Sequence, residues 1–413
     1  MSLTESAPAT TYDVGGIKLP RPFRIRRIGH VGLNVDRMDE AVAFYTKRLG
    51  LRISDPLNFG QRLPPEQQKE HPYHTGYFMR HGTDHHSFVI FPRSTFEAFG
   101  ALRGGRPDSR VTTNQITWQV GSLRETVEGD IFLRERGARV SRVGRDTPGS
   151  NWHVYPVGPE GFVNELYYGI EQIGWDGESK PEAMHKIHYM EAPQLPHKSE
   201  AAEIAAATAD GVDIASGYRQ FETEEERYDV GGVLLGRPFK IVRVGPVRLF
   251  LEDVDAAIPF YRDILGLTIA EEVTWRGHRC VFLRANTEHH SLALYPEALR
   301  DELGLRPDSK LFSVGFQVAD YRQLRDAVAY LREAGVTIRE LPPELFPGID
   351  YTAFAIDPDG NAVQLYYYME QVGWDGRPRP ASQRRTVSPG PWPDQLDAVD
   401  DTFLGEAYLG PWG

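Results

Sequence analysis

The feature that most constrains this chain is that it repeats itself. The stretch "IGHVGLNVDRMDEAVAFYTKRLGL", from Ile28 to Leu51, matches "VGPVRLFLEDVDAAIPFYRDILGL", from Val244 to Leu267, along its whole length. A repeat of this length predicts an internal duplication, in which each half folds as one copy of the same unit. One position breaks the match, because His30 in the first copy stands where Pro246 stands in the second.

The ends of the two copies are also recognisable. "YDVGG" begins 216 residues apart, at Tyr12 and Tyr228, whereas the closing "EQIGWDG" and "EQVGWDG" lie 199 residues apart. The second copy is therefore 17 residues shorter, and much of that loss falls in the loop "NFGQRLPPEQQKEHPYH" of the first. We expect one domain at 12–190, a linker at 191–227 with a short alanine-rich helix, a second domain at 228–383, and an irregular tail at 384–413 that packs on the body or on a neighbouring subunit.

Within each half a smaller unit is written twice. Residues 27–35 alternate polar and apolar as a strand does, a helical pattern follows to Gly50, and three short strand-like stretches come next. The same order begins again at "NQITWQV". The chain therefore predicts an α+β fold of four βαβββ modules, paired into two cup-shaped domains. The polar faces of the opening strands would line each cup.

Composition narrows the function classes. The formal net charge of -12 argues against nucleic-acid binding, which needs a basic face. Cys280 is the single cysteine, which excludes internal disulfides and cysteine-based zinc or iron–sulfur sites. No segment approaches 18 continuous apolar residues, and the first residues lack the basic and apolar regions of a signal peptide, so we expect a cytoplasmic protein without a membrane partner.

Three polar residues of the first half converge on its cup in this arrangement. His30 and Gln115 lie on the polar faces of the two opening strands, and Glu165 lies in the otherwise apolar "FVNELYY". A buried carboxylate needs a partner, and a metal would supply one, although a buried arginine is an alternative. For Gln115 the alternative is a hydrogen bond inside the cup.

At these residues the chain resembles the vicinal oxygen chelate superfamily, which includes glyoxalase I, the bleomycin-resistance proteins and the extradiol ring-cleaving dioxygenases. The resemblance covers about 24–177 and 240–376. It implies paired modules that form glyoxalase-like cups, with metal ligands at the positions of His30, Gln115 and Glu165.

The resemblance to two-domain extradiol dioxygenases goes further. "YPVGPEGFVNE" places Tyr155 ten residues before Glu165, as in those enzymes, with Gly158 at the position of their usual aspartate. "DHHSFVIF" places His86 at their second-shell histidine, which implies catalytic roles for His86 and Tyr155. Substrate contacts are expected for Trp152, His153 and His85, with a surface position as the alternative for His85.

The resemblance implies an Fe(II)-dependent dioxygenase that opens a catechol-like ring with dioxygen. One departure is that the dioxygenases have a second histidine where this chain has Gln115, a weaker, neutral donor, so Mn(II) or another divalent metal is the alternative cofactor. The alternative functions are a glyoxalase-type lyase or isomerase and a metal-free protein that binds aromatic compounds. We expect a small aromatic substrate, no macromolecular ligand, and a homo-oligomer.

The second half lacks this set. Its matching positions read Pro246, Ser313 and Gln364, and Phe354 replaces the tyrosine. Proline cannot ligate a metal, so we expect the second half to be a scaffold that has lost its chemistry. In the two-domain dioxygenases that it resembles, the active half is instead the second.

Overall fold

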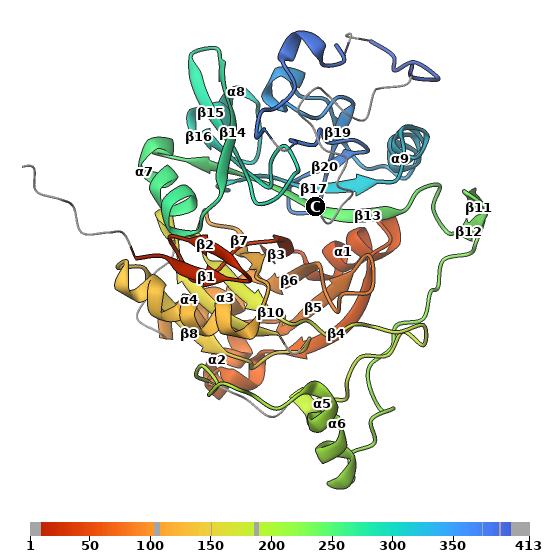
Figure 1. Cartoon of the computed structure of the whole chain (residues 1–413). Helices are drawn as coiled ribbons and strands as arrows, with labels where there is room; N and C mark the ends of the chain where they lie inside the picture. The colour runs from red at the N-terminus through yellow and green to blue at the C-terminus, as the bar shows by residue number, and fades with distance from the viewer. Residues whose placement is uncertain are drawn as a thin grey trace, which may run out of the picture.

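The structure is a computed structural model that describes residues 10–102, 108–149, 151–185, 190–373, 375–387 and 390–397. Two mixed sheets of eight strands dominate it, with few helices. Figure 1 shows the N-terminal sheet, red to yellow, below the C-terminal sheet, green to blue. Both sheets have the same strand order, so the predicted α+β fold of two duplicated glyoxalase-like domains is confirmed.

The N-terminal sheet places the two opening strands side by side at its centre. Its strands, in spatial order, are β4 (Arg52–Asn58), β5 (Thr75–Arg80), β6 (Phe88–Pro92), β3 (Arg27–Val35), β7 (Thr113–Gln119), β10 (Asn164–Tyr168), β9 (Trp152–Val157) and β8 (Arg139–Gly144). Its helices are α1 (Met38–Ala43), which continues as a π-helical turn, η1 (Phe44–Arg48), and α2 (Pro65–Glu70), α3 (Arg93–Leu102) and α4 (Leu123–Glu135).

The C-terminal sheet repeats this order. It runs β14 (Thr268–Trp275), β15 (His278–Arg284), β16 (Leu292–Pro296), β13 (Ile241–Leu251), β17 (Leu311–Val318), β20 (Ala362–Tyr366), β19 (Thr352–Ile356) and β18 (Ile338–Arg339). Its helices are α7 (Val254–Pro259) with the π-helical turn η4 (Phe260–Ile264), α8 (Ala298–Glu302) and α9 (Tyr321–Glu333). Each half opens with a small hairpin, β1 (Tyr12–Val14) with β2 (Ile17–Leu19) and β11 (Tyr228–Val230) with β12 (Val233–Leu235).

Local sequence explains the helices that cover the sheets. The side chain of Ser122 caps α4 by accepting a hydrogen bond from the backbone N–H of Glu125. Gly137, with a φ of +78°, supplies the left-handed residue that follows the helix end. Along the first helix Met38, Tyr45 and Leu49 are buried, as their helical spacing predicts.

The two halves share one hydrophobic core. Phe88 of β6 packs edge to face on Phe316 of β17, with ring centroids 5.4 Å apart. The Tyr45 hydroxyl donates a hydrogen bond to Asp357 Oδ2 across the same boundary, at 2.8 Å. Because the helix-side faces of both sheets point into this shared core, the opposite faces remain for the two cups.

The connecting segments also have structure. The alanine-rich stretch forms α6 (Glu200–Ala209), and α5 (Glu182–His185) precedes it. At the start of the tail, Trp392 packs on Tyr321 and Tyr351, so this part lies on the body, while 398–413 fall outside the described residues. Among the described helices, none has the length and apolar character to cross a membrane.

Candidate metal centre

The three residues predicted as ligands meet on the central strands of the N-terminal sheet. His30 lies on β3, Gln115 on β7 and Glu165 on β10. The His30 Nε2 atom is 3.2 Å from Glu165 Oε2 and 2.9 Å from Gln115 Nε2, and Gln115 Nε2 is 3.4 Å from Glu165 Oε2. All three side chains are buried, with exposed fractions of 1%, 7% and 0%.

An irregular stretch of β3 positions His30. The register between β3 and β7 shifts between Ile28 and Val31, which places His30 in a bulge. Thr117 of β7 fixes the backbone there, because its hydroxyl accepts from His30 N–H at 2.6 Å and donates to the His30 carbonyl at 2.7 Å. Glu165 of the neighbouring strand β10 pairs directly with Thr117, so Thr117 holds both His30 and Glu165 in register.

The spacing of these donor atoms fits a divalent cation. Ligand bonds of about 2.1 Å at right angles put neighbouring donors about 3 Å apart. A half-turn of the Gln115 amide exchanges Nε2 and Oε1, so its oxygen can occupy the converging position. Among the described residues no three His, Cys, Asp or Glu side chains are grouped as metal ligands, so a cation held by His30 and Glu165 would take the amide oxygen of Gln115 as its third protein ligand.

The local electrostatics keep Glu165 ionised. Burial raises the pKa of a carboxyl group, but His30, His153 and Arg142 outweigh it and lower the pKa of Glu165 below its usual value. The second carboxylate oxygen, Oε1, accepts a hydrogen bond from Asn151 Nδ2 at 2.7 Å. The carboxylate is thus oriented with Oε2 toward His30 and Gln115.

His86 lies beside this set. It precedes β6, and its ring centroid is 4.2 Å from that of His30. Burial, followed by the proximity of His30 and His85, lowers the pKa of His86 well below its usual value, which keeps the ring neutral. The surface alternative for His85 is wrong, because His85 is fully buried between His86 and Asp55 of β4.

Asp55 was not predicted as a neighbour of the site. Its carboxylate Oδ2 lies 2.7 Å from His85 Nε2. A signal existed, because the second half carries Glu271 on the equivalent strand β14, and an acidic residue beside a buried histidine pair in both copies indicates a shared role. Asn34 and Asn114 were also missed as neighbours of the site, and the Asn114 amide donates to Asn34 Oδ1 at 2.9 Å.

The structure separates the predicted residues of β9. His153 and Tyr155 lie on the same face as Glu165, and His153 Nδ1 is 4.0 Å from Glu165 Oε1. Burial is the main cause that raises the pKa of Tyr155 well above its usual value, against the opposing charge of Arg142, whose guanidinium lies 4.1 Å from the Tyr155 ring centroid. Tyr155 is therefore a neutral hydrogen-bond donor.

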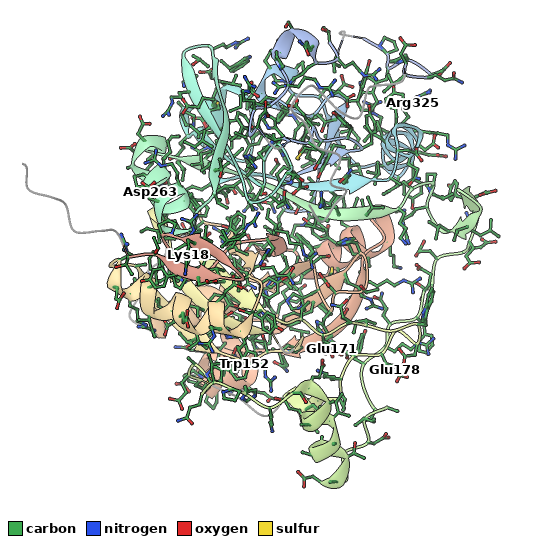
Figure 2. All side chains as sticks on the ribbon, in the orientation of Figure 1. Lys18, Trp152, Glu171, Glu178, Asp263 and Arg325 are labelled. Carbon is green, nitrogen blue, oxygen red and sulfur yellow. The ribbon has the colours of Figure 1, made fainter. Side chains whose placement is uncertain are left out.

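Trp152 lies on the other face of β9. Its ring contacts His197 at 5.0 Å between centroids, and the guanidinium of Arg145 lies over it, on the side of the linker that carries α6 (Figure 2). Because successive side chains of a strand point to opposite faces, Trp152 faces away from the cup that His153 lines. The expectation of a substrate contact for Trp152 has no support in this arrangement.

The sequence of the chain is similar to one family model and to one known enzyme. The sequence model of the Glyoxalase/Bleomycin resistance protein/Dioxygenase superfamily matches residues 27–95 and 243–365, one segment in each half. Each half of the chain therefore resembles this superfamily over its matched segment. A 2,2',3-trihydroxybiphenyl dioxygenase of Sphingomonas paucimobilis is 25% identical over 133 residues, which are 32% of this chain and 44% of that protein's length.

Several solved structures share the two-domain fold. The Mn(II)-bound glyoxalase of Novosphingobium aromaticivorans has a TM-score of 0.52 at 15% identity, with 86% of this chain and 85% of that chain covered. The 2,3-dioxygenase LapB of Pseudomonas sp. KL28 has a TM-score of 0.53 at 15% identity, with coverages of 84% and 94%. Homoprotocatechuate 2,3-dioxygenase of Arthrobacter globiformis has 0.51 at 14%, with 85% and 82%.

The C-terminal domain has a different cup. Arg248 of β13 pairs with Ser313 as Gly32 of β3 pairs with Gln115, so the arginine stands at the position of a glycine. Its guanidinium donates to Gln364 Oε1, at the position of Glu165, and its Nη2 is 2.9 Å from His290 Nε2, at the position of His86. Arg248 is fully buried, and no described carboxylate forms an ion pair with it.

Proposed function

We propose that this chain is a metal-dependent extradiol-type dioxygenase that cleaves a catechol-like dihydroxy-aromatic with dioxygen, in the cup of its N-terminal domain. The observation that carries the proposal is the convergence of His30, Gln115 and Glu165 in a buried cup that also holds His86 and Tyr155. The partial similarity to a trihydroxybiphenyl dioxygenase supports the substrate class.

His30, Gln115 and Glu165 would hold the cation, Fe(II) in this proposal, with Mn(II) or another divalent metal as the alternative. When bound, it would supply a Lewis acid that holds adjacent substrate oxygens in a chelate.

Residues of the chain itself would move the proton, stabilise the developing charge and orient the substrate. His86, neutral and beside His30, accepts a proton from a substrate hydroxyl. Tyr155 remains a phenol at neutral pH and donates a hydrogen bond to an oxygen on which negative charge develops. His153 lines the same face and orients the substrate. The buried walls of the cup exclude water from these groups, which strengthens each electrostatic interaction.

A glyoxalase-type lyase or isomerase is the second candidate, and one observation favours it. The third donor is an amide rather than a second imidazole, and a Mn(II)-bound glyoxalase shares this fold. In that reaction the residues would polarise a carbonyl and move a proton without consuming dioxygen. A metal-free protein that binds an aromatic compound is the third candidate.

Oxygen uptake separates these functions. Protein purified anaerobically and loaded with Fe(II) is assayed in an oxygen electrode with a panel of substituted catechols, and with a methylglyoxal–thiol adduct in parallel. We expect about one dioxygen per catechol cleaved, as ring opening requires. Turnover of the adduct without oxygen uptake on any catechol supports the lyase, and aromatic binding by a metal-free protein inactive in both assays supports the third candidate.

The duplication supplies a matched pair of variants. His86→Ala should slow turnover by on the order of 10²–10⁴, the range for a positioned acid or base, without loss of metal. His290→Ala removes the equivalent histidine of the second cup and should leave turnover at the wild-type level. Equal losses in both variants would contradict an active site confined to the first half.

A further inference from the structure

Three hydrogen-bonded side chains, Asp55, His85 and His86, form a series that ends at the wall of the first cup. Asp55 Oδ2 lies 2.7 Å from His85 Nε2, and His85 Nδ1 lies 2.9 Å from His86 Nδ1. The two imidazole rings are nearly perpendicular, at 89°. No described residue bonds to the remaining nitrogen of His86, Nε2, on a ring that packs against His30. The hydrogen positions along this series decide whether that nitrogen donates or accepts.

The second cup contains the same series, with Arg248 added at its inner end and Arg384 at its outer end, where Arg384 Nη2 donates to Glu271 Oε2 at 2.6 Å and lies 3.3 Å from His289 Nε2. Glu271 Oε2 lies 2.8 Å from His289 Nε2, and His289 Nδ1 lies 3.0 Å from His290 Nδ1, again with rings at 89°. Here the last nitrogen, His290 Nε2, has a partner, Arg248 Nη2 at 2.9 Å. The second half therefore repeats the geometry of the first with its open end occupied.

That partner fixes every proton in the second series. A guanidinium only donates, so His290 Nε2 accepts from Arg248. Burial, and then the charge of Arg248, lower the pKa of His290 well below its usual value, so the ring is neutral and its proton is on Nδ1. This proton is donated to His289 Nδ1, which leaves the proton of His289 on Nε2, facing the carboxylate of Glu271. The reverse order would place two donors between Arg248 and His290.

The first series has the same spacing, the same ring angle and the same carboxylate end. We propose that Asp55 and His85 are positioning residues that hold His86 with its proton on Nδ1, so that its Nε2 lone pair faces the cup and can accept a proton from a substrate hydroxyl. The role of that acceptor rests on the proposed function, whereas the proton arrangement does not. The carboxylate accepts from His85, His85 accepts from His86, and the free lone pair is left at the cup.

Nitrogen NMR reads this arrangement directly, without metal or substrate. In metal-free protein labelled with ¹⁵N at its 13 histidines, two-bond and three-bond couplings distinguish the two neutral forms of each ring. His86→Gln and His290→Gln identify the two signals. We expect the Nδ1–H form for both His290 and His86. An Nε2–H form at His86 in the wild-type protein would overturn the proposal.

Variants of Asp55 and His85 test whether these two residues set the tautomer of His86. Asp55→Asn keeps the volume of the side chain but can present an N–H to His85, the change known to reverse the tautomer of a catalytic histidine. It should convert His86 to the Nε2–H form or to a mixture. His289→Ala, the matched change in the second half, should leave the His86 signal unaltered. If Asp55→Asn and His85→Ala both leave His86 as Nδ1–H, the assignment of these positioning residues is wrong.

Asp55→Glu is the conservative variant, because the second half uses Glu271 at this place, and it should retain the wild-type signal. In metal-loaded enzyme active on a catechol, Asp55→Asn should lower kcat about tenfold to a hundredfold, with KM nearly unchanged. Asp55→Glu should restore most of the loss. The Nδ1–H form without any catechol turnover would leave this inference standing and remove the dioxygenase. Catechol turnover by a protein whose His86 carries its proton on Nε2 would overturn this inference and leave the dioxygenase proposal standing.

Discussion

The two cups share one backbone and differ in what fills them. In the first, Asn34 and Asn114 bond to each other across β3 and β7. At the same register of the second, Phe250 and Phe312 stack with centroids 4.8 Å apart and planes within 6°. These two rings belong to a cluster of buried apolar side chains that occupies the second cup. The same place in the two sheets therefore supports either a hydrogen-bonded amide pair or an aromatic stack.

The difference at Gly32 and Arg248 is the most instructive. A Cβ at Gly32 would come within 2.9 Å of Val89 and 3.2 Å of the Gln115 side chain, so in the first cup this position has no room for a side chain unless those neighbours shift. In the second cup Arg248 occupies the equivalent position and carries a permanent positive charge to the residues at the Glu165 and His86 positions. Both cups thus gather groups that favour a cation, and the second obtains one from its own sequence.

Burial of that guanidinium is costly without a carboxylate, so its neutral contacts matter. Gln364 and His290 accept from it, and it lies 5.2 Å from the ring centroid of Phe346, which adds a cation–π contact. Loss of one of these contacts should therefore destabilise the second cup. Loss of a donor from the first cup should instead remove the metal and leave the protein folded.

The largest expected effect is loss of metal from the first cup alone. His30→Ala and Glu165→Gln should each lower metal affinity by more than about a hundredfold, because even residues that only support ligands cost about 10–100-fold. Metal analysis and competition with a chelator measure it. Ser313→Ala, at the position of Gln115 in the second half, is the control and should keep one metal per chain. A protein emptied by Ser313→Ala but not by His30→Ala would place the site in the wrong half.

Next comes stability of the second cup. Gln364→Met removes one of the two hydrogen-bond acceptors of the buried Arg248 guanidinium and should lower the free energy of unfolding by about 1.5–3 kcal/mol, the range for a hydrogen bond to a charged group. The double variant with Arg248→Met removes that charge and should recover most of the loss. Urea denaturation measures both. No recovery in the double variant would mean that Gln364 does not act through Arg248.

The role of Gln115 gives a smaller effect. Gln115→Ala should lower metal affinity about tenfold, less than removal of the charged Glu165, because an amide oxygen is a neutral and weaker donor. Gln115→His should keep the metal and tighten Fe(II), since imidazole is the stronger ligand. Chelator competition at fixed pH compares the three proteins. Equal affinity in wild type and Gln115→Ala would show that Gln115 only lines the cup.

The smallest effect is a pH dependence from the second half. Hydrogen bonds from His289 and Arg384 outweigh burial and lower the pKa of Glu271 to about 2. A depressed folded-state pKa stabilises the protein above the unfolded-state pKa of about 4.3, and this contribution is lost as pH falls toward 2. Because Glu271 is only half-buried, we expect at most about 1 kcal/mol. Urea denaturation from pH 6 to 2 should show a shallower acid loss for Glu271→Gln than for Glu344→Gln, an exposed control.

The sequence by itself determined the duplication, the four modules and the positions His30, Gln115 and Glu165, because period, spacing and the matched copies record which residues share a face. It also indicated that the second copy had lost its ligands, since proline at the His30 position has no donor. Hydrophobic periodicity is local, and these conclusions needed only local information.

Only the tertiary structure decided what occupies the second cup. Arg248 is one more charged residue in a strand until pairing across β13, β17 and β20 brings it against Gln364 and His290, which are 116 and 42 residues away. The same holds for Asp55 and His85, which meet because β4 lies near the segment that precedes β6. Contacts between distant strands depend on register, and a single residue of shift reverses which side chains meet.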